Sequence, residues 1–302
     1  MKTIIIAGGT GFLGNLLENY FSNKGYQIKI LSRKPKKENH IYWDAQTLDD
    51  WTKELENAEV LINLTGKTIN NRFTDKNKQL IKDSRVASTM VLGEAINLCE
   101  NPPKTWMNSS TTSLYKESYD VFMSEEKNEI GNDFEQEVAT VWENAFHKTE
   151  NPKTRKIILR TSIVLGENGG AFPTLKKLTK FGLGGKQGNG KQKVSWIHEY
   201  DFIKVVEFLL NKENLSGAFN LCVPKPTENQ YLMKSLRKVL NIPFGLNSPT
   251  PILKLGAIIL GTESELILKS RNVIPKWLLD NGFKFKYENI ETALSNLINS
   301  KS

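Results

Sequence analysis

The stretch Gly8-Gly9-Thr10-Gly11-Phe12-Leu13-Gly14 decides the fold, because its regularly spaced glycines stand between two unlike patterns. The apolar run Thr3–Ala7 before it is typical of a strand that is buried on both faces. The segment Phe12–Lys24 after it has the periodicity of an amphipathic helix. A glycine motif is informative only in this context, where it joins a strand to a helix.

Each spaced glycine has its own physical task in a phosphate-binding turn. Gly8 permits the tight turn, Gly11 lets the backbone approach a pyrophosphate, and Gly14 allows close packing of the helix on the sheet. The helix N-terminus adds free N–H groups and the positive end of its dipole. The sequence therefore predicts a dinucleotide site. The residues expected to contact the cofactor in this turn are Gly8, Thr10, Gly11, Phe12, Leu13 and Gly14.

Strand and helix patterns alternate through the first two-thirds of the chain. This alternation predicts an α/β fold of the Rossmann type, with a doubly wound parallel sheet and a smaller, mainly helical lobe. The predicted strands are Thr3–Ala7, Tyr26–Leu31, Val60–Leu64, Thr105–Ser109, Lys156–Arg160 and Ala218–Leu221. The predicted helices are Phe12–Lys24, Thr74–Leu98, Phe134–His147 and Phe202–Leu210.

The residue pattern of the sequence changes after Gly166. We expect a Rossmann core over residues 1–165, to which the chain returns around 200–222. Residues 166–199 and 223–302 would form the substrate lobe and a C-terminal extension. The glycine-rich loop Gly182–Gly190 could close over a substrate, because clustered glycines permit unusual backbone conformations.

Composition excludes several classes of function. The chain has 302 residues, 39% of them hydrophobic, and a net charge of +8. Its lysines are scattered among Asn and Glu without a DNA-binding motif, so we expect no nucleic-acid partner. The best candidate for a membrane span, Ile252–Leu260, is too short and is interrupted by Lys254, so it predicts a buried helix. Cys99 and Cys222 match no metal-ligand spacing, and no leader pattern begins the sequence, which favours a cytoplasmic protein.

The end of the second predicted strand indicates which cofactor is bound. A carboxylate at this place would accept hydrogen bonds from a ribose 2′-OH, whereas a basic residue accommodates a 2′-phosphate. Here Ser32 and Arg33 follow the strand, and no acidic residue occurs before Glu38. Arg33 can grip a phosphate with its planar fork, so the sequence predicts NADP(H).

Further motifs in the chain carry a resemblance to a known protein family. They are Ser32-Arg33-Lys34-Pro35, Trp43-Asp44, Asn63–Gly66, Asp83-Ser84-Arg85, Leu159–Gly166, Gly182–Gly185, Ser195–His198, Ser270–Pro275 and Asn281–Phe283. With the glycine turn, this set resembles the atypical, epimerase-like branch of the short-chain dehydrogenase/reductase superfamily, which carries a short extra C-terminal domain.

The resemblance implies further contacts. Leu64, Thr65 and Gly66 would pass under the adenosine and ribose of the cofactor, and Arg85 would reach its phosphate or ribose side. Trp196 and His198 would line the substrate side. For His198 the residues leave a second interpretation open, in which it only orients backbone at the start of a helix.

The superfamily's catalytic pair is missing. In this superfamily a Tyr transfers the proton and a Lys four residues later lowers its pKa. Alignment on the helix that ends in Trp142-Glu143 puts Glu135 in the Tyr position and Ala139 in the Lys position. A desolvated carboxyl with a raised pKa can act as an acid near neutral pH, so Glu135 is a candidate proton donor.

The hydroxyl end of the catalytic pattern is better preserved. The segment Asn108–Tyr115 resembles the epimerase segment in which a hydroxyl precedes a Tyr by four residues. It predicts that Thr111, or Thr112 in the neighbouring register, holds the substrate oxygen and that Tyr115 is a second candidate proton donor. The sequence therefore favours an NADP(H)-dependent oxidoreductase or epimerase-like enzyme acting on a small carbonyl or secondary alcohol. The alternative is a catalytically weak NADP(H)-binding or redox-sensing module, and the sequence predicts no particular oligomeric state.

Overall fold

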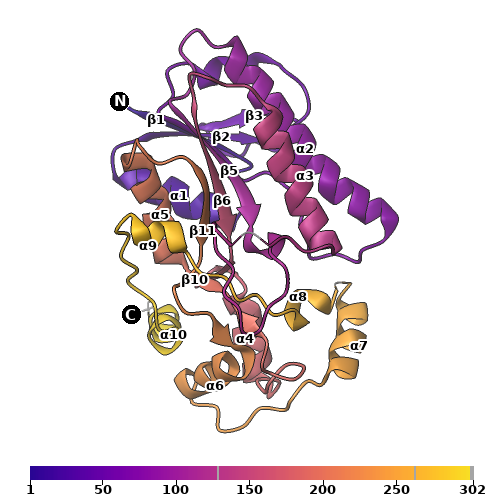
Figure 1. Cartoon of the computed structure of the whole chain (residues 1–302). Helices are drawn as coiled ribbons and strands as arrows, with labels where there is room; N and C mark the ends of the chain where they lie inside the picture. Colours follow the sequence, from indigo (N-terminus) through magenta and orange to yellow (C-terminus); the bar gives the residue numbers. More distant parts are fainter. Residues whose placement is uncertain (128, 262, 300–302) are drawn as a thin grey trace.

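Seven parallel strands form the centre of the molecule, in the order β11-β6-β5-β4-β1-β2-β3 (Figure 1). The computed structural model describes residues 1–127, 129–261 and 263–299. The seven strands are β1 Thr3–Ala7, β2 Gln27–Ser32, β3 His40–Tyr42, β4 Val60–Asn63, β5 Thr105–Thr111, β6 Arg155–Thr161 and β11 Gly217–Leu221. The predicted fold class is confirmed.

This strand order reverses direction between β1 and β4. The chain runs from β1 outward through β2 and β3, then crosses back to β4 and continues in the other direction to β11. Ligands of open α/β sheets bind where the order reverses, at the carboxyl ends of the strands. The turn that follows β1 and the loop that follows β4 both lie at that point.

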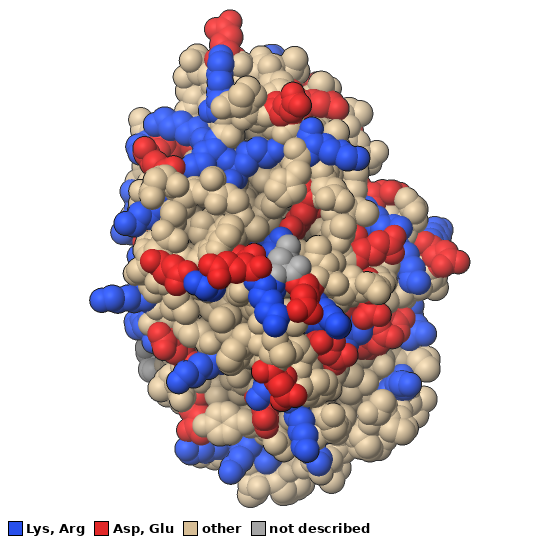
Figure 2. Space-filling model, in the orientation of Figure 1, with Lys and Arg blue, Asp and Glu red and all other residues tan. Residues whose placement is uncertain are grey.

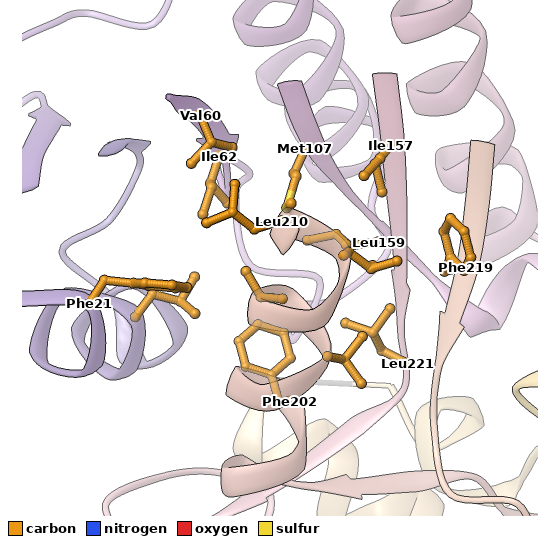
Figure 3. Packing of buried hydrophobic residues seen from close by; sticks show 14 of the residues in the cluster. Phe21, Val60, Ile62, Met107, Ile157, Leu159, Phe202, Leu210, Phe219 and Leu221 are labelled. Carbon is orange, nitrogen blue, oxygen red and sulfur yellow. The ribbon is translucent and has the colours of Figure 1, made fainter. Parts of the chain in front are cut away.

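Helices cover both faces of the sheet, which explains why the strands are apolar on both sides. Alternate side chains point to opposite faces: Ile4 and Ile6 belong to one buried cluster, Ile5 and Ala7 to the other. The first cluster includes helices α1 (Phe12–Asn23) and α5 (Glu199–Asn211). The second includes α2 (Asp75–Leu98) and α3 (Phe134–Lys148). Figure 3 shows Phe202 and Leu210 of α5 among the side chains of β4, β5 and β6.

A smaller lobe lies beyond the carboxyl ends of the strands (Figure 1). Its buried cluster includes Leu165, Trp196 and side chains of α4, α6 and α10. Its helices are α4 Phe172–Lys180, α6 Asn229–Val239, α7 Thr250–Leu260, α8 Glu265–Leu268 and α10 Ile290–Asn299. Helix α9 Lys276–Asp280 instead packs on β11, where Leu278 joins the first buried cluster of the core and Trp277 contacts Phe219. Its short strands are β7 Ile163–Gly166, β8 Gly169–Gly170, β9 Lys193–Val194, β10 Trp196–His198 and β12 Thr227–Glu228.

The two 3-10 turns, η1 Asp50–Leu55 and η2 Thr112–Leu114, complete the secondary structure of the core. The short strand β3 and the lobe strands were not predicted, because two to four residues carry too little periodicity. In the described part of the chain, no helix combines the length and apolar character needed to cross a bilayer.

The prediction that Ile252–Leu260 is a buried helix is wrong in one respect. The segment does form helix α7, but Ile252, Leu255, Ile258 and Ile259 are between 58% and 76% exposed. Among the side chains described for the helix, Ala257 is the buried one. Helix formation followed from the local sequence, whereas burial depended on what the rest of the fold places against it.

Charged side chains of both signs are spread over the surface. On the face drawn in Figure 2, Lys and Arg are interspersed with Asp and Glu, with a denser row of basic side chains across the upper part. On this face the basic side chains therefore stand together with acidic counter-charges.

Candidate cofactor-binding and active site

The glycine turn after β1 is shaped by two close approaches. Gly8 has a φ of +71°, and a Cβ at this position would lie 2.7 Å from Thr65 Oγ1. A Cβ on Gly14 would lie 2.1 Å from the carbonyl oxygen of Gly9. A Cβ on Gly11, in contrast, would meet nothing within 4 Å. The outer two glycines therefore build the turn, and the middle one leaves its backbone open to a ligand.

Helix α1 begins at this turn without a side-chain cap. Gly11 is its N-cap residue, makes no side-chain cap hydrogen bond, and is followed by no acidic residue in the first turn. The first N–H groups of the helix are thus available to an anion. Thr10 is exposed, while Leu13 packs against the core and the ring of Phe12 lies against Gly166 and Gly169. The side chains of Phe12 and Leu13 therefore pack against the protein and are half-buried.

The end of β2 presents a free cation. Ser32 is buried, and its hydroxyl accepts a hydrogen bond from the Lys34 N–H at 3.2 Å. Arg33 is exposed and has no ion-pair partner among the described residues. The arrangement leaves its guanidinium available for a group that lies beside the end of β2.

The loop after β4 is fixed by an amide network. Asn63 donates from its side-chain amide to Asn108 Oδ1 at 2.7 Å and accepts from the Thr65 N–H at 3.0 Å. The Thr65 hydroxyl oxygen is buried beside Gly8 and has no hydrogen-bond partner among the described residues. A phosphate or ribose bound at the switch point between β1 and β4 would give this orphaned hydroxyl a hydrogen-bond partner.

Arg85 supports this loop from α2. Its Nη1 donates to the carbonyl oxygens of Lys67 and Ile81, both at 2.9 Å, and its guanidinium lies 4.9 Å from the ring centre of Trp142. Burial lowers the pKa of Arg85 to about 10. The described contacts show Arg85 holding the loop beside Gly66, and its expected contact with a cofactor stays a prediction.

The two hydroxyls at the end of β5 differ in access. Thr111 is the last residue of β5 and is half-buried, with its hydroxyl accepting from the Ser113 N–H at 3.0 Å. Thr112 is only 3% exposed. Of the two registers that the sequence left open, the geometry favours Thr111 as the group that could reach a substrate.

Tyr115 is not placed as a proton donor. Its side chain is fully buried, and its hydroxyl donates to Asn220 Oδ1 at 2.8 Å while accepting from Arg160 Nη1 at 2.9 Å. Burial raises the pKa of Tyr115 to about 12. Arg160 in turn forms a buried ion pair with Glu143 at 2.8 Å. Tyr115 therefore belongs to a core network that joins the end of η2 to β11, β6 and α3, and we withdraw it as a candidate.

Glu135 lies in the first turn of α3 and is 4% exposed. Its Oε2 accepts from Arg271 Nη2 at 3.0 Å, and Lys269 Nζ lies 3.7 Å from Oε1. Ala139, in the position of the missing Lys, is fully buried. The sequence did not predict these two cationic partners, although the quoted motif Ser270–Pro275 contains one of them.

Trp196 and His198 have structural roles rather than surfaces that a substrate could touch. Trp196 is fully buried in the lobe, and its indole N–H donates to Thr227 Oγ1 at 3.0 Å. His198 is the N-cap of α5, where Nδ1 accepts from the Tyr200 N–H at 3.0 Å, and its ring stacks on Tyr287. Burial lowers the pKa of His198 to about 4. The backbone-orienting alternative describes His198 correctly.

The loop Gly182–Gly190 is fastened to the segment that precedes α7. The N–H of Gly185 donates to the Leu246 carbonyl at 3.1 Å, and the N–H of Gly188 donates to the Ser248 carbonyl at 2.9 Å. Closure of this loop over a substrate stays a prediction.

Comparison with known proteins places this geometry in a family. Residues 4–222 match the NAD dependent epimerase/dehydratase family, and residues 248–297 match a domain of unknown function, DUF1731. The chain belongs to the NAD dependent epimerase/dehydratase family. The resemblance deduced from the sequence motifs, including the extra C-terminal domain, is confirmed.

Relatives match over the whole chain. An epimerase family protein of Staphylococcus aureus strain N315 is 35% identical, and one of Staphylococcus epidermidis is 33% identical, each over 99% of both chains. Among solved structures, the human epimerase family protein SDR39U1 with NADPH is 26% identical, with a TM-score of 0.89 over 98% of each chain. A nucleoside-diphosphate sugar epimerase from Corynebacterium glutamicum is 27% identical, with a TM-score of 0.81 over 99% of this chain and 58% of that one.

Proposed function

We propose that this protein is an NADP(H)-dependent oxidoreductase or epimerase-like enzyme that acts on a small carbonyl compound or secondary alcohol. The observation that carries the proposal is the glycine turn at the switch point between β1 and β4. The orphaned Thr65 hydroxyl lies beside Gly8, and the same turn has the open face of Gly11 and the uncapped start of α1. The solved relative that contains NADPH supports the same cofactor here.

Arg33 supports the choice of NADP(H) over NAD(H). It is an exposed guanidinium directly after β2, where a 2′-phosphate would lie, and it forms no ion pair with the residues that the structure describes. The adjacent Ser32 hydroxyl already accepts one hydrogen bond and can donate its proton to the same phosphate.

The chemistry at the other end of the site rests on Thr111 and Glu135. Bound NADP(H) supplies or accepts the hydride at a carbon of the substrate. Thr111 would hold the substrate oxygen through its half-buried hydroxyl. Glu135, paired with Arg271 as a carboxylate, would accept the proton of a secondary alcohol as the alcohol is oxidised to a carbonyl. In the reverse direction the same carboxyl would return that proton to the carbonyl oxygen.

The second candidate function is a cofactor-binding or redox-sensing module without turnover. It is favoured by one observation, namely that the Tyr and Lys positions hold Glu135 and the buried Ala139. The two functions share the cofactor site and differ only at the substrate.

Titration of the full chain with NADPH and with NADH, followed by tryptophan fluorescence, tests the cofactor. We expect tighter binding of NADPH, and we expect Arg33→Ala to weaken NADPH about tenfold or more, because a charge-assisted hydrogen bond contributes about 1.5–3 kcal/mol. Binding of NADH by the same variant is the internal control and should not change. Equal affinity of the parent for both cofactors would refute the proposed role of Arg33.

Cofactor turnover with a panel of ketones, aldehydes and secondary alcohols then separates the two functions. Turnover of a panel compound supports the enzyme. Tight NADPH binding without turnover of any panel compound supports the module.

A further inference from the structure

A charged cluster joins the first turn of α3 to the C-terminal extension. Glu135 is the central carboxylate, and Arg271 and Lys269, which follow α8, are its cationic neighbours at 3.0 and 3.7 Å. The side chains of Arg271 and Lys269 are only 11% and 13% exposed. The extension therefore delivers positive charge to a buried position beside the proposed proton-transfer group.

Three polar atoms of this cluster make no hydrogen bond among the described residues. They are Glu135 Oε1, Arg271 Nη1 and Lys269 Nζ, and all three are buried. Burying a polar atom without a partner is unfavourable, and such atoms call for an explanation. Arg271 thus fixes one carboxylate oxygen of Glu135, whereas the other oxygen makes no hydrogen bond and has Lys269 Nζ 3.7 Å away.

The backbone of Arg271 is held firmly on both sides. Its carbonyl accepts a hydrogen bond from the Ser195 hydroxyl at 2.8 Å. The neighbouring Ser270 hydroxyl donates to the Ser118 carbonyl at 2.7 Å, and the Asn272 carbonyl accepts from the Met123 N–H at 2.8 Å. A side chain that must orient another group needs this kind of support.

Lys269 is arranged differently. Its Nζ lies 2.7 Å from Asp133 and 3.2 Å from Glu265, so two more exposed carboxylates share its charge. Arg271 has its ion pair with Glu135 alone among the described residues, which makes it the partner dedicated to that group.

We propose that Arg271 is a positioning residue for Glu135. It anchors Oε2 so that Oε1 is presented to the reacting hydroxyl of the substrate, and the C-terminal extension thereby completes the active centre. This inference rests on the proposed function, in which Glu135 exchanges the substrate's proton. Ala139 cannot supply a charge from α3 itself, and Arg271 supplies one from a segment more than 130 residues later.

A double-mutant cycle on the full chain with its cofactor tests this role. The probes are the panel ketones and secondary alcohols, and kcat and KM are measured for each variant. We expect Glu135→Gln to lower kcat about 100-fold, in the range of a lost general base. We expect Arg271→Ala to lower kcat about tenfold with little change in KM, and Arg271→Lys to recover part of the loss. In the Glu135→Gln background, Arg271→Ala should lower kcat no further.

Lys276→Ala is the matched control. Lys276 is another cation of the extension, 3.3 Å from Glu126, and its removal should leave kcat unchanged. Binding of NADPH by every variant shows that it is folded, and Arg271→Lys covers the case in which Arg271→Ala does not fold.

Each outcome decides the matter. Independent, multiplicative losses in kcat from Glu135→Gln and Arg271→Ala would overturn the positioning role. So would an unchanged kcat in Arg271→Ala while Glu135→Gln is impaired, and then the proposed function survives. A parent that binds NADPH and turns over no panel compound refutes the proposed chemistry, and the inference falls with it.

Discussion

The start of α1 rests directly on the glycine turn: a Cβ on Gly14 would lie 2.1 Å from the carbonyl oxygen of Gly9. Gly14→Ala must therefore push the helix away from the turn. We expect it to lower the free energy of unfolding by about 1–3 kcal/mol, the usual cost of overpacking, and to abolish NADPH binding. Denaturant unfolding and a fluorescence titration measure the two effects.

Gly11→Ala is the matched substitution for this test. Its Cβ would enter open space, so stability should stay within about 0.5 kcal/mol of the parent, as for other exposed positions. NADPH affinity should nevertheless fall, because the methyl group would occupy the face where the pyrophosphate approaches. Unchanged affinity in Gly11→Ala would place the cofactor elsewhere.

Tyr115→Phe tests the assignment of Tyr115 to the core. The change removes the acceptor of Arg160 Nη1 and the donor to Asn220, both in a fully buried position. We expect a loss of about 1–3 kcal/mol in the free energy of unfolding. The kcat with a panel substrate should not change. Tyr231→Phe, which removes an exposed hydroxyl bonded to Glu291, is the control and should affect neither quantity.

These residues show what local sequence can reveal. The turn at Gly8–Gly14 and the cation Arg33 lie within one strand-turn-helix unit and the next strand, so their spacing carried the prediction. Tyr115 was misjudged because its partners Arg160 and Asn220 are 45 and 105 positions away. Arg271 is 136 positions from Glu135, and no periodicity connects them. Contacts between distant segments are set by the fold. A residue pattern within one helix or strand does not show which distant residues will pack against it.

Helix α7 gives a prediction about its exposed apolar face. Ile259 is 76% exposed, so Ile259→Lys should change the free energy of unfolding by no more than about 0.5 kcal/mol. Leu294→Ala in α10 is the contrast, because Leu294 is fully buried in the lobe and such truncations cost about 2–5 kcal/mol. Thermal and denaturant unfolding check both values. A large loss in Ile259→Lys would show that this face is covered in solution.

From the burial of His198 we predict that the free energy of unfolding falls in acid. Burial lowers its pKa to about 4 in the folded protein, whereas an unfolded His titrates near 6.5. As the pH falls from about 6.5 to about 4, the unfolded chain binds a proton that the folded chain does not, so the unfolded state is favoured progressively. The largest contribution is about 3 kcal/mol, reached near pH 4 and constant below it. Above pH 6.5 the group contributes no pH dependence.

His198→Asn isolates this effect, because Asn also accepts a hydrogen bond at a helix N-cap but does not titrate. Replacing the ring loses its stacking on Tyr287, so the variant should be less stable than the parent at pH 8. Its stability should then fall less steeply than that of the parent between pH 6.5 and 4. Denaturant unfolding at a series of pH values measures the difference between the two proteins. Parallel curves for the two proteins would mean that His198 takes up its proton in the folded state as readily as in the unfolded one.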